Sequence, residues 1–255
     1  MSARLLALLC AASCSAAPDA SAPKRFTLPE ALHCGRAVPE ACGPRIRSFP
    51  ELPSTLCESC GDGGGGPEDP PVTAGQMSDA AAIAKRLFDN HRWSAAAPRM
   101  LAVARGDTND DAGNRQLADY HLAVALYYLG DRNAAADLWT GIAWNPRHLK
   151  FGEAMLWLGR LAVYDGCATR PVLEALTRYR DEPITCSSAA PVTMTFRNPT
   201  RPGDRERWQA VLFARARGLM LVGNDREARS VFESMLREPL LSAAARQCLK
   251  TLGPG

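Results

Sequence analysis

The cysteines whose spacing could support chemistry lie in the first quarter of the chain. In Cys57-Glu-Ser-Cys60, two thiols are separated by two residues, as in half of a zinc site or in a redox-active pair. Cys34 and Cys42 are separated by seven residues, so they do not supply the matching half of a zinc site, and only His33 lies beside them. Four interpretations stay open for these cysteines: structural disulfides, unpaired thiols, a metal site and a catalytic thiol pair.

Other catalytic and metal-binding patterns are weak. The segment Asp107–Asp111 alternates oxygen ligands as a calcium loop does, but Ala112 and Ala118 stand where such a loop needs glycine and glutamate. Acidic residues at a helix N-terminus explain this segment better. No zinc-protease pair, nucleophile elbow or phosphate loop is present, and a thioredoxin-like site would need a βαβ pattern around Cys57. We therefore predict no catalysis, no metal and no cofactor. The histidines of the helical region show no ligand spacing: His91, His121 and His148.

The first residues are typical of an export signal. Arg4 precedes an apolar run from Leu5 to Ala12, which is shorter than the roughly 20 residues of a membrane-spanning helix. The segment Ala11-Ala12-Ser13-Cys14 resembles the lipobox of bacterial lipoproteins, although Ala11 stands where that pattern usually has leucine. The resemblance implies a signal peptide over residues 1–13 and a diacylated Cys14 that anchors the chain in a membrane. Ordinary signal-peptidase cleavage, for example after Ala16, is the alternative.

Export changes what is expected of the cysteines, because disulfides are the default in an oxidising compartment. Of nine cysteines, Cys10 would leave with the signal and Cys14 would carry lipid, so seven remain and at least one is left over. A Cys167–Cys186 pair would close a loop of about 20 residues, and Cys248 is our candidate for the leftover thiol. We expect disulfides among the other six: Cys34, Cys42, Cys57, Cys60, Cys167 and Cys186.

Composition indicates a globular chain with a linker near its start. Of the 255 residues 46% are hydrophobic and 22% charged, and a net charge of +3 is too small for a nucleic-acid-binding surface. Residues 23–75 hold many of the prolines, and four consecutive glycines precede Pro67, which no regular element accommodates. We predict a disordered leader and linker over residues 14–76 and a helical domain over residues 77–255.

From Met77 onward, apolar residues recur at intervals of three and four, which predicts helices in successive pairs. The longest break in the pattern, Asp181 to Gly203, is expected to form a surface loop tied by Cys186. The expected helices are 79–90 with 94–105, 110–130 with 133–144, 149–165 with 169–180, and 204–222 with 225–237, followed by a closing helix at 242–252.

The pairs match one another at fixed distances from their turns. Five, nine, twelve and sixteen residues after a turn glycine come a small residue, two large apolar residues and a proline. After Gly130 these are Ala135, Trp139, Ile142 and Pro146, and after Gly223 they are Ala228, Phe232, Met235 and Pro239. With one more residue in the turn, the other pairs give Ala96, Met100 and Val103 after Asn90, and Val172, Leu176, Tyr179 and Pro183 after Gly166.

This pattern resembles the tetratricopeptide repeat, a helix pair in which small residues let the helices approach and an aromatic residue fills the space above. The resemblance covers residues 79–239. The turn-to-turn spacings of 40, 36 and 57 residues differ from the regular 34, and prolines stand at Pro98 and Pro171, so we call the units tetratricopeptide-like. The fold class expected is an all-α solenoid of about four helix pairs and a closing helix.

The resemblance also implies a binding surface. In tetratricopeptide proteins the first helices of successive pairs line a concave groove that binds peptides or protein segments. An aromatic stripe at this spacing is also typical of a helical core, so the two interpretations stand side by side. The positions that correspond to the groove are Tyr120, Val124, Tyr127, Glu153, Arg160, Tyr164, Phe213, Arg217 and Met220.

Together these features predict a lipid-anchored scaffold or adaptor of the bacterial cell envelope that faces the periplasm. By resemblance to bacterial tetratricopeptide lipoproteins, its work would be that of an assembly factor or pilotin, and its partner another envelope protein or peptide segment rather than a small-molecule substrate or nucleic acid. By resemblance to the sorting of enterobacterial lipoproteins, Ser15 after Cys14 favours the outer membrane. The alternative is an exported thiol, disulfide or metal-binding protein that uses the leader cysteines, in which the helices act only as support.

Overall fold

The computed structural model describes residues 34–43, 72–145, 147–179, 202–238 and 240–253, with side chains omitted at 202–205. Over these residues the protein is all-α, and the described part contains no strand. The helices are α2 (Asp79–Asp89), α3 (Trp93–Arg105), α4 (Ala112–Leu129), α5 (Arg132–Ala143), α6 (Phe151–Tyr164), α7 (Arg170–Leu176), α8 (Pro202–Leu221), α9 (Asp225–Ser234) with the 3₁₀ turn η1 (Met235–Arg237), and α10 (Ser242–Leu252).

These bounds confirm the expected helices, with differences at two ends. Helix α7 stops at Leu176 instead of near residue 180, and the hydroxyl of Thr177 donates to the carbonyl of Glu174. The last turn of α9 tightens into the 3₁₀ turn η1. Because helix ends fray and often adopt 3₁₀ geometry, these are the positions where a periodic pattern predicts least well.

Local chemistry explains where the helices begin and end. The carboxylate of Asp111 accepts from the backbone N–H of Asn114 and starts α4, and Asp131 caps α5 through Ala134 in the same way. Gly130 ends α4 with φ of 93°, a left-handed conformation that glycine adopts without steric cost. The sequence expectation that Asp110 or Asp111 caps this helix is therefore confirmed for Asp111.

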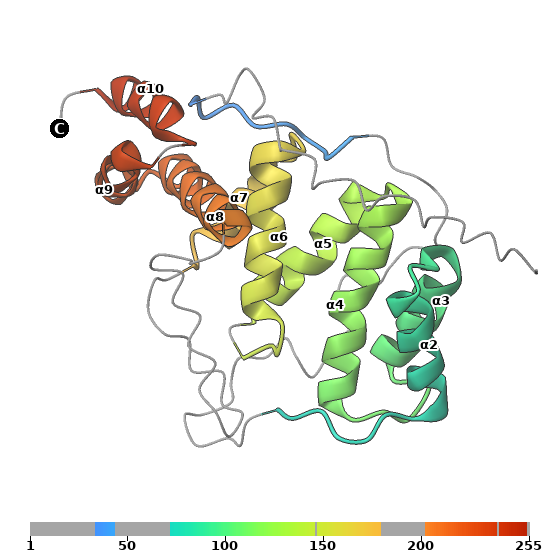
Figure 1. Ribbon diagram of the computed structural model, residues 1–255. Helices are drawn as coiled ribbons and strands as arrows, with labels where there is room; N and C mark the ends of the chain where they lie inside the picture. Colours follow the sequence, from blue (N-terminus) through green and yellow to red (C-terminus); the bar gives the residue numbers. More distant parts are fainter. Residues whose placement is uncertain (1–33, 44–71, 146, 180–201, 239, 254–255) are drawn as a thin grey trace, which may run out of the picture.

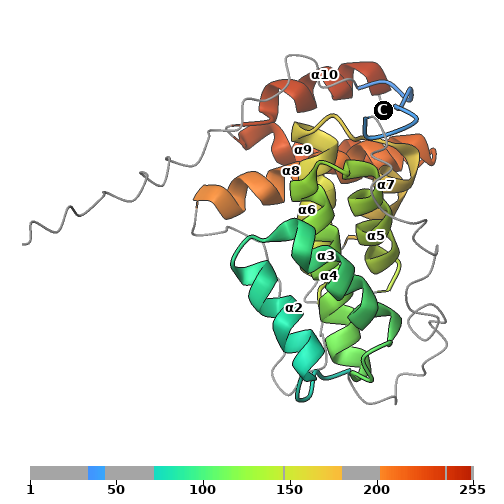
Figure 2. The same cartoon turned by 90° about the vertical axis from the view of Figure 1, so that its right-hand side faces the viewer.

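Helices that follow one another in the chain pack together throughout, from α2 to α10 (Figure 1). Helix α8 packs against both α6 and α7, and it lies across α6 rather than beside it, as the two views together show (Figure 2). Helices α9 and α10 follow at one end of the molecule, while α2 and α3 lie at the other.

The crossing of α6 and α8 depends on a small residue. A side chain at Gly159 of α6 would lie 2.8 Å from the backbone nitrogen of Val211 and 2.9 Å from its Cα. Gly159 therefore lets the two helix backbones approach closely. Similarly, a Cβ at Gly218 of α8 would lie 2.2 Å from the carbonyl oxygen of Leu173 in α7. Glycines thus determine how α8 packs against both preceding helices.

The apolar core runs through all the helices and is filled mostly by alanine, leucine and a few aromatic rings. Trp139, Phe213 and Phe232 are fully enclosed, and the rings of Phe213 and Phe232 meet edge to face between α8 and α9. On α2 the small residues Ala81 and Ala84 face the core, whereas the larger Ile83 is 48% exposed.

The segment Cys34–Gly43, which we call the strap, runs past the starts of α9, α7 and α5 (Figure 1). At one end the backbone N–H of Cys42 donates to Oδ1 of Asn133 at the start of α5, at 2.8 Å. At the other end Arg36 forms an exposed ion pair with Asp225 at the start of α9, at 2.9 Å. The expectation of a disordered leader is therefore wrong for the strap.

Residues just before α2 are also held in place, in contrast to the expected linker. Asp111 accepts a hydrogen bond from the backbone N–H of Gly75, and Asp110 accepts from both the N–H and the hydroxyl of Ser78. These bonds tie the entry of the helical domain to the start of α4.

Candidate functional site

The predicted groove residues fall into two groups by burial. Val124, Phe213, Arg217 and Met220 are buried, so they belong to the core of the described structure rather than to an open surface. The other five are half-buried and lie on α4 and α6: Tyr120, Tyr127, Glu153, Arg160 and Tyr164.

Trp157 of α6 organises this surface, and sequence reasoning did not single it out. Its ring stacks on that of Trp139 with centroids 4.7 Å apart and meets Tyr127 at 4.9 Å. Its indole N–H donates to the hydroxyl oxygen of Tyr120 at 3.0 Å. The indole is therefore held by a fully buried ring beneath it and by α4 beside it.

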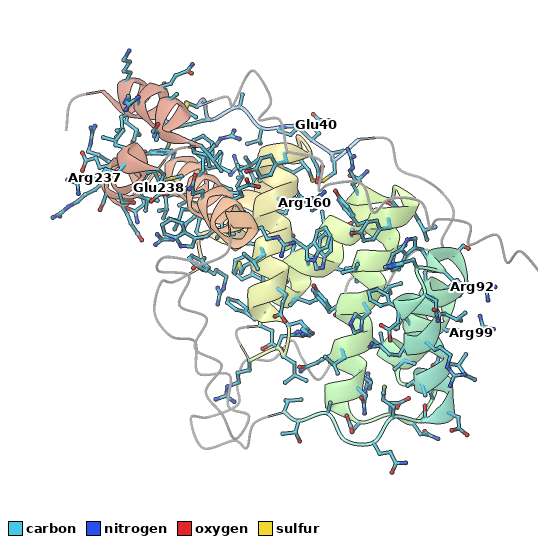
Figure 3. The ribbon with its side chains drawn as sticks, in the orientation of Figure 1. Glu40, Arg92, Arg99, Arg160, Arg237 and Glu238 are labelled. Carbon is cyan, nitrogen blue, oxygen red and sulfur yellow. A yellow bond between two sulfur atoms is a disulfide. The ribbon has the colours of Figure 1, made fainter. Side chains whose placement is uncertain are left out.

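Arg160 lies over this aromatic group between α4 and α6 (Figure 3). Its guanidinium carbon is 5.3 Å from the ring centre of Tyr127 and 5.4 Å from that of Trp157, within the range of cation–π attraction. Asp165 accepts a hydrogen bond from the hydroxyl of Tyr127 at 3.0 Å and lies 3.7 Å from the Arg160 guanidinium. Burial and the charge of Asp165 raise the pKa of Tyr127, so the hydroxyl keeps its proton at neutral pH.

The aromatic contacts continue to the outside of the molecule. Tyr128 is 53% exposed, its ring stacks on Trp93 at 4.7 Å, and it meets Trp157 edge to face at 6.3 Å. Phe88 of α2 contacts both Trp93 and His121. Burial, with smaller contributions from Lys85 and Lys150, lowers the pKa of His121 to about 4, so this ring is neutral at pH 7. We call this set the aromatic face: Phe88, Trp93, Tyr120, Tyr127, Tyr128 and Trp157, with Arg160.

A charged pair flanks the aromatic face on its Tyr120 side. Lys150 lies 5.7 Å from the centre of the Tyr120 ring and pairs with Glu153 at 2.6 Å. Burial raises the pKa of Tyr164, the last predicted groove residue on α6, to about 12, and the charge of Glu206 adds to the effect. This surface thus offers aromatic rings, the cations of Arg160 and Lys150 over them, and the carboxylate of Glu153 at one edge. Such a combination suits recognition of a protein partner by contact.

The sequence contained a partial signal for this surface. Tyr120 and Tyr127 were expected as groove positions by resemblance to tetratricopeptide proteins, whereas Trp93, Tyr128 and Trp157 were missed. Tyr128 directly follows Tyr127, and neighbouring residues on a helix point in different directions. Only the packing of α3 and α6 beside α4 brings these rings together.

The cysteines form two disulfides that join the strap to the helices. Cys34 pairs with Cys248 of α10, and Cys42 pairs with Cys167 just before α7. Two expectations are therefore wrong: Cys248 is not the leftover thiol, and Cys167 does not pair with Cys186. Loop length alone favoured the nearby partner, whereas the fold places the strap across the start of α7. Cys14, Cys57, Cys60 and Cys186 lie outside the described residues.

The carboxylates of the acidic segment before α4 accept hydrogen bonds from nearby residues in the structure. Asp110 accepts from Ser78 and from the Thr108 hydroxyl, and Asp111 caps the helix. Burial tends to raise the pKa of Asp110, but these hydrogen bonds outweigh it and lower the pKa below its usual value.

His148 is buried, and its Nδ1 accepts from the backbone N–H of Lys150. Among the described residues no group of three or more His, Cys, Asp or Glu side chains could hold a metal ion.

No helix in the described part of the chain is long and apolar enough to cross a membrane. Comparison of the chain with models of protein families, with characterised proteins and with solved structures gave no match.

Proposed function

We propose that the protein is a tetratricopeptide-like scaffold or adaptor of the bacterial cell envelope that performs no catalysis. In this proposal Cys14 carries the lipid anchor, the helical body faces the periplasm, with the outer membrane favoured, and another envelope protein or peptide segment binds to the aromatic face. The observation that carries the proposal is the aromatic face, which is half-buried except for the exposed Tyr128, with Arg160 over its rings.

Equal burial at equivalent positions supports the repeat. The small residue that lies five or six positions after each turn residue is almost completely enclosed. The larger apolar residue four positions further on is enclosed to the same degree. Such agreement is expected if each pair packs its second helix against its first in the same way. The residues are Ala96, Ala135, Val172 and Ala228 for the small position, and Met100, Trp139, Leu176 and Phe232 for the large one.

The composition of the aromatic face supports protein binding. Tyrosine, tryptophan and arginine are the residues that most often dominate the energy of protein interfaces, and a rigid ring loses little entropy when it is covered. Trp157 and Tyr127 are fixed in place by hydrogen bonds to Tyr120 and Asp165. Tyr128 and Arg160 therefore stand on a surface that needs little reorganisation to accept a partner.

Site-specific photocrosslinking in the native envelope tests the proposal. A photoreactive amino acid at Tyr128 should give a discrete adduct with another envelope protein. The same group at Arg99, which is exposed on α3 and labelled in Figure 3, is the control and should not give that adduct. Replacement of Arg160 by alanine should weaken the Tyr128 adduct, because the cation over the rings is lost. Equal labelling from Tyr128 and Arg99 would contradict the proposal.

A further inference from the structure

The disulfide between Cys34 and Cys248 determines where an N-terminal tether leaves the helical body. Without the two disulfides of the strap, the chain would enter the body at α2, 65 residues after Cys14. The Cys42–Cys167 bond alone would hold the chain beside α7, 28 residues after Cys14, and with the Cys34–Cys248 bond it reaches the body at α10, 20 residues after Cys14. At full extension, 20 residues span about 70 Å and 65 residues about 220 Å. Together the two disulfides therefore shorten the tether about threefold.

The two disulfides also change which end of the molecule the tether leaves. Helix α10 and the Cys34 end of the strap lie at one end of the body, and α2 lies at the other, in both views (Figures 1 and 2). The strap is held there along its length, by Cys34 at α10, by Arg36 at α9 and by Cys42 at α7. A membrane anchor on the N-terminus would thus draw the α10 end toward the lipid and leave the α2 end and the aromatic face farther away.

The charge of α10 fits a lipid surface. Helix α10, described over its whole length, has no acidic residue, and its exposed side includes Arg246 and Lys250. The strap adds Arg36, which pairs with Asp225 of α9, and Glu40, so the basic charge of this edge comes from Arg246 and Lys250. Basic residues beside an anchor are attracted to anionic headgroups.

We propose that the edge formed by α10 and the strap is a membrane-facing surface that rests against anionic lipid headgroups. This inference rests on the proposed lipid anchor at Cys14. It assigns to the Cys34–Cys248 disulfide a role beyond stability, because that bond places the tether beside the basic side of α10.

Lysine labelling offers a direct test, because the chain has only four lysines. Lys250 lies on α10, whereas Lys85 on α2 provides an internal control at the opposite end. The full-length protein recovered from bacterial membranes would be reconstituted into vesicles of phosphatidylcholine with or without phosphatidylglycerol. An amine-reactive reagent would then modify it, with the soluble Cys14→Ser chain as reference. Intact mass first shows whether Cys14 is acylated.

In vesicles that contain phosphatidylglycerol, Lys250 should be labelled about fivefold more slowly than in the soluble chain, while Lys85 should be unchanged. Arg246→Glu should reduce this protection to less than about twofold, and Arg99→Glu, the matched reversal on α3, should not. Circular dichroism would verify that both variants remain helical.

Three results would overturn the inference. Protection of Lys85 instead of Lys250, or of neither, would show that the α10 edge does not face the lipid although the anchor is present. Equal protection of Lys250 without phosphatidylglycerol would exclude recognition of anionic headgroups. A mass without acyl groups would refute the anchor itself, and the crosslinking result at Tyr128 would then decide separately whether the binding role stands.

Discussion

The indole of Trp157 stacks on that of Trp139 with ring centres 4.7 Å apart and planes inclined by 10°. Trp139 lies on α5 and Trp157 on α6. The stack therefore joins the core to the aromatic face, since Trp139 is fully buried and Trp157 is half-buried beneath Arg160. At this point the proposed binding surface rests directly on the core.

Replacing Trp139 by alanine should lower the free energy of unfolding by about 3–5 kcal/mol, because a large ring is removed from a fully packed site. Trp144→Ala is the matched control, because this ring is 51% exposed and lies against the guanidinium of Arg178. The control should cost about 1 kcal/mol or less. Urea unfolding followed by circular dichroism measures both, and similar losses for the two variants would contradict the assigned packing.

Gly159→Ala should separate α6 from α8. The added Cβ would lie within 3 Å of the Val211 backbone, which cannot move away as a flexible side chain could. We expect a loss of about 1–3 kcal/mol. In Gly141→Ala on α5 the new methyl meets nothing within 4 Å, so the better helix propensity should stabilise the protein by up to about 1 kcal/mol. Thermal unfolding of both variants should therefore shift in opposite directions.

Loss of either disulfide should reduce stability by about 2–5 kcal/mol, because each bond closes a long loop in the unfolded chain. Peptide mapping without reduction should recover Cys34 linked to Cys248, and Cys42 linked to Cys167. The double variant Cys34→Ser with Cys248→Ser should unfold at a lower temperature than the parent. Recovery of a Cys167–Cys186 peptide from the folded protein would contradict the observed connectivity.

Asp119 should make the stability depend on pH in an unusual direction. Burial raises the pKa of this carboxyl from 3.8 to about 7, and its Oδ1 is enclosed without a hydrogen-bond partner. The folded state therefore holds the proton of Asp119 more tightly than the unfolded state does. The contribution of Asp119 to the free energy of unfolding is thus highest below pH 3.8 and falls as the pH rises to about 7.

In Asp119→Asn this loss should disappear. The variant should match the parent near pH 4 and exceed it by roughly 1–2 kcal/mol at pH 8, given about 1.4 kcal/mol per pKa unit and a side chain that is only half-buried. Urea unfolding at several pH values is the measurement, with Asp107→Asn on the exposed turn before α4 as control. A constant difference between variant and parent across this range would contradict the assignment.

The helices could be predicted from the sequence because their determinants are local. Apolar residues at intervals of three and four, Asp111 and Asp131 as caps, and Gly130 in a left-handed conformation act within one or two turns of chain. The residues at fixed distances from the turns, such as Ala135 and Phe232, were also recognised as core positions in advance. These features require no knowledge of what the helices pack against.

The partners of the cysteines and the composition of the aromatic face depend on contacts between distant segments. Cys34 meets Cys248 across 214 residues, and no local pattern distinguishes that pairing from one between neighbours. Tyr128 joins Trp93 and Trp157 only because α3 and α6 pack on either side of α4. Phe213 and Arg217 correspond in the sequence pattern to the half-buried Tyr120 and Arg160, but the passage of α8 across α6 accompanies their burial. Local periodicity determined the elements, and the packing between them decided which side chains form the surface.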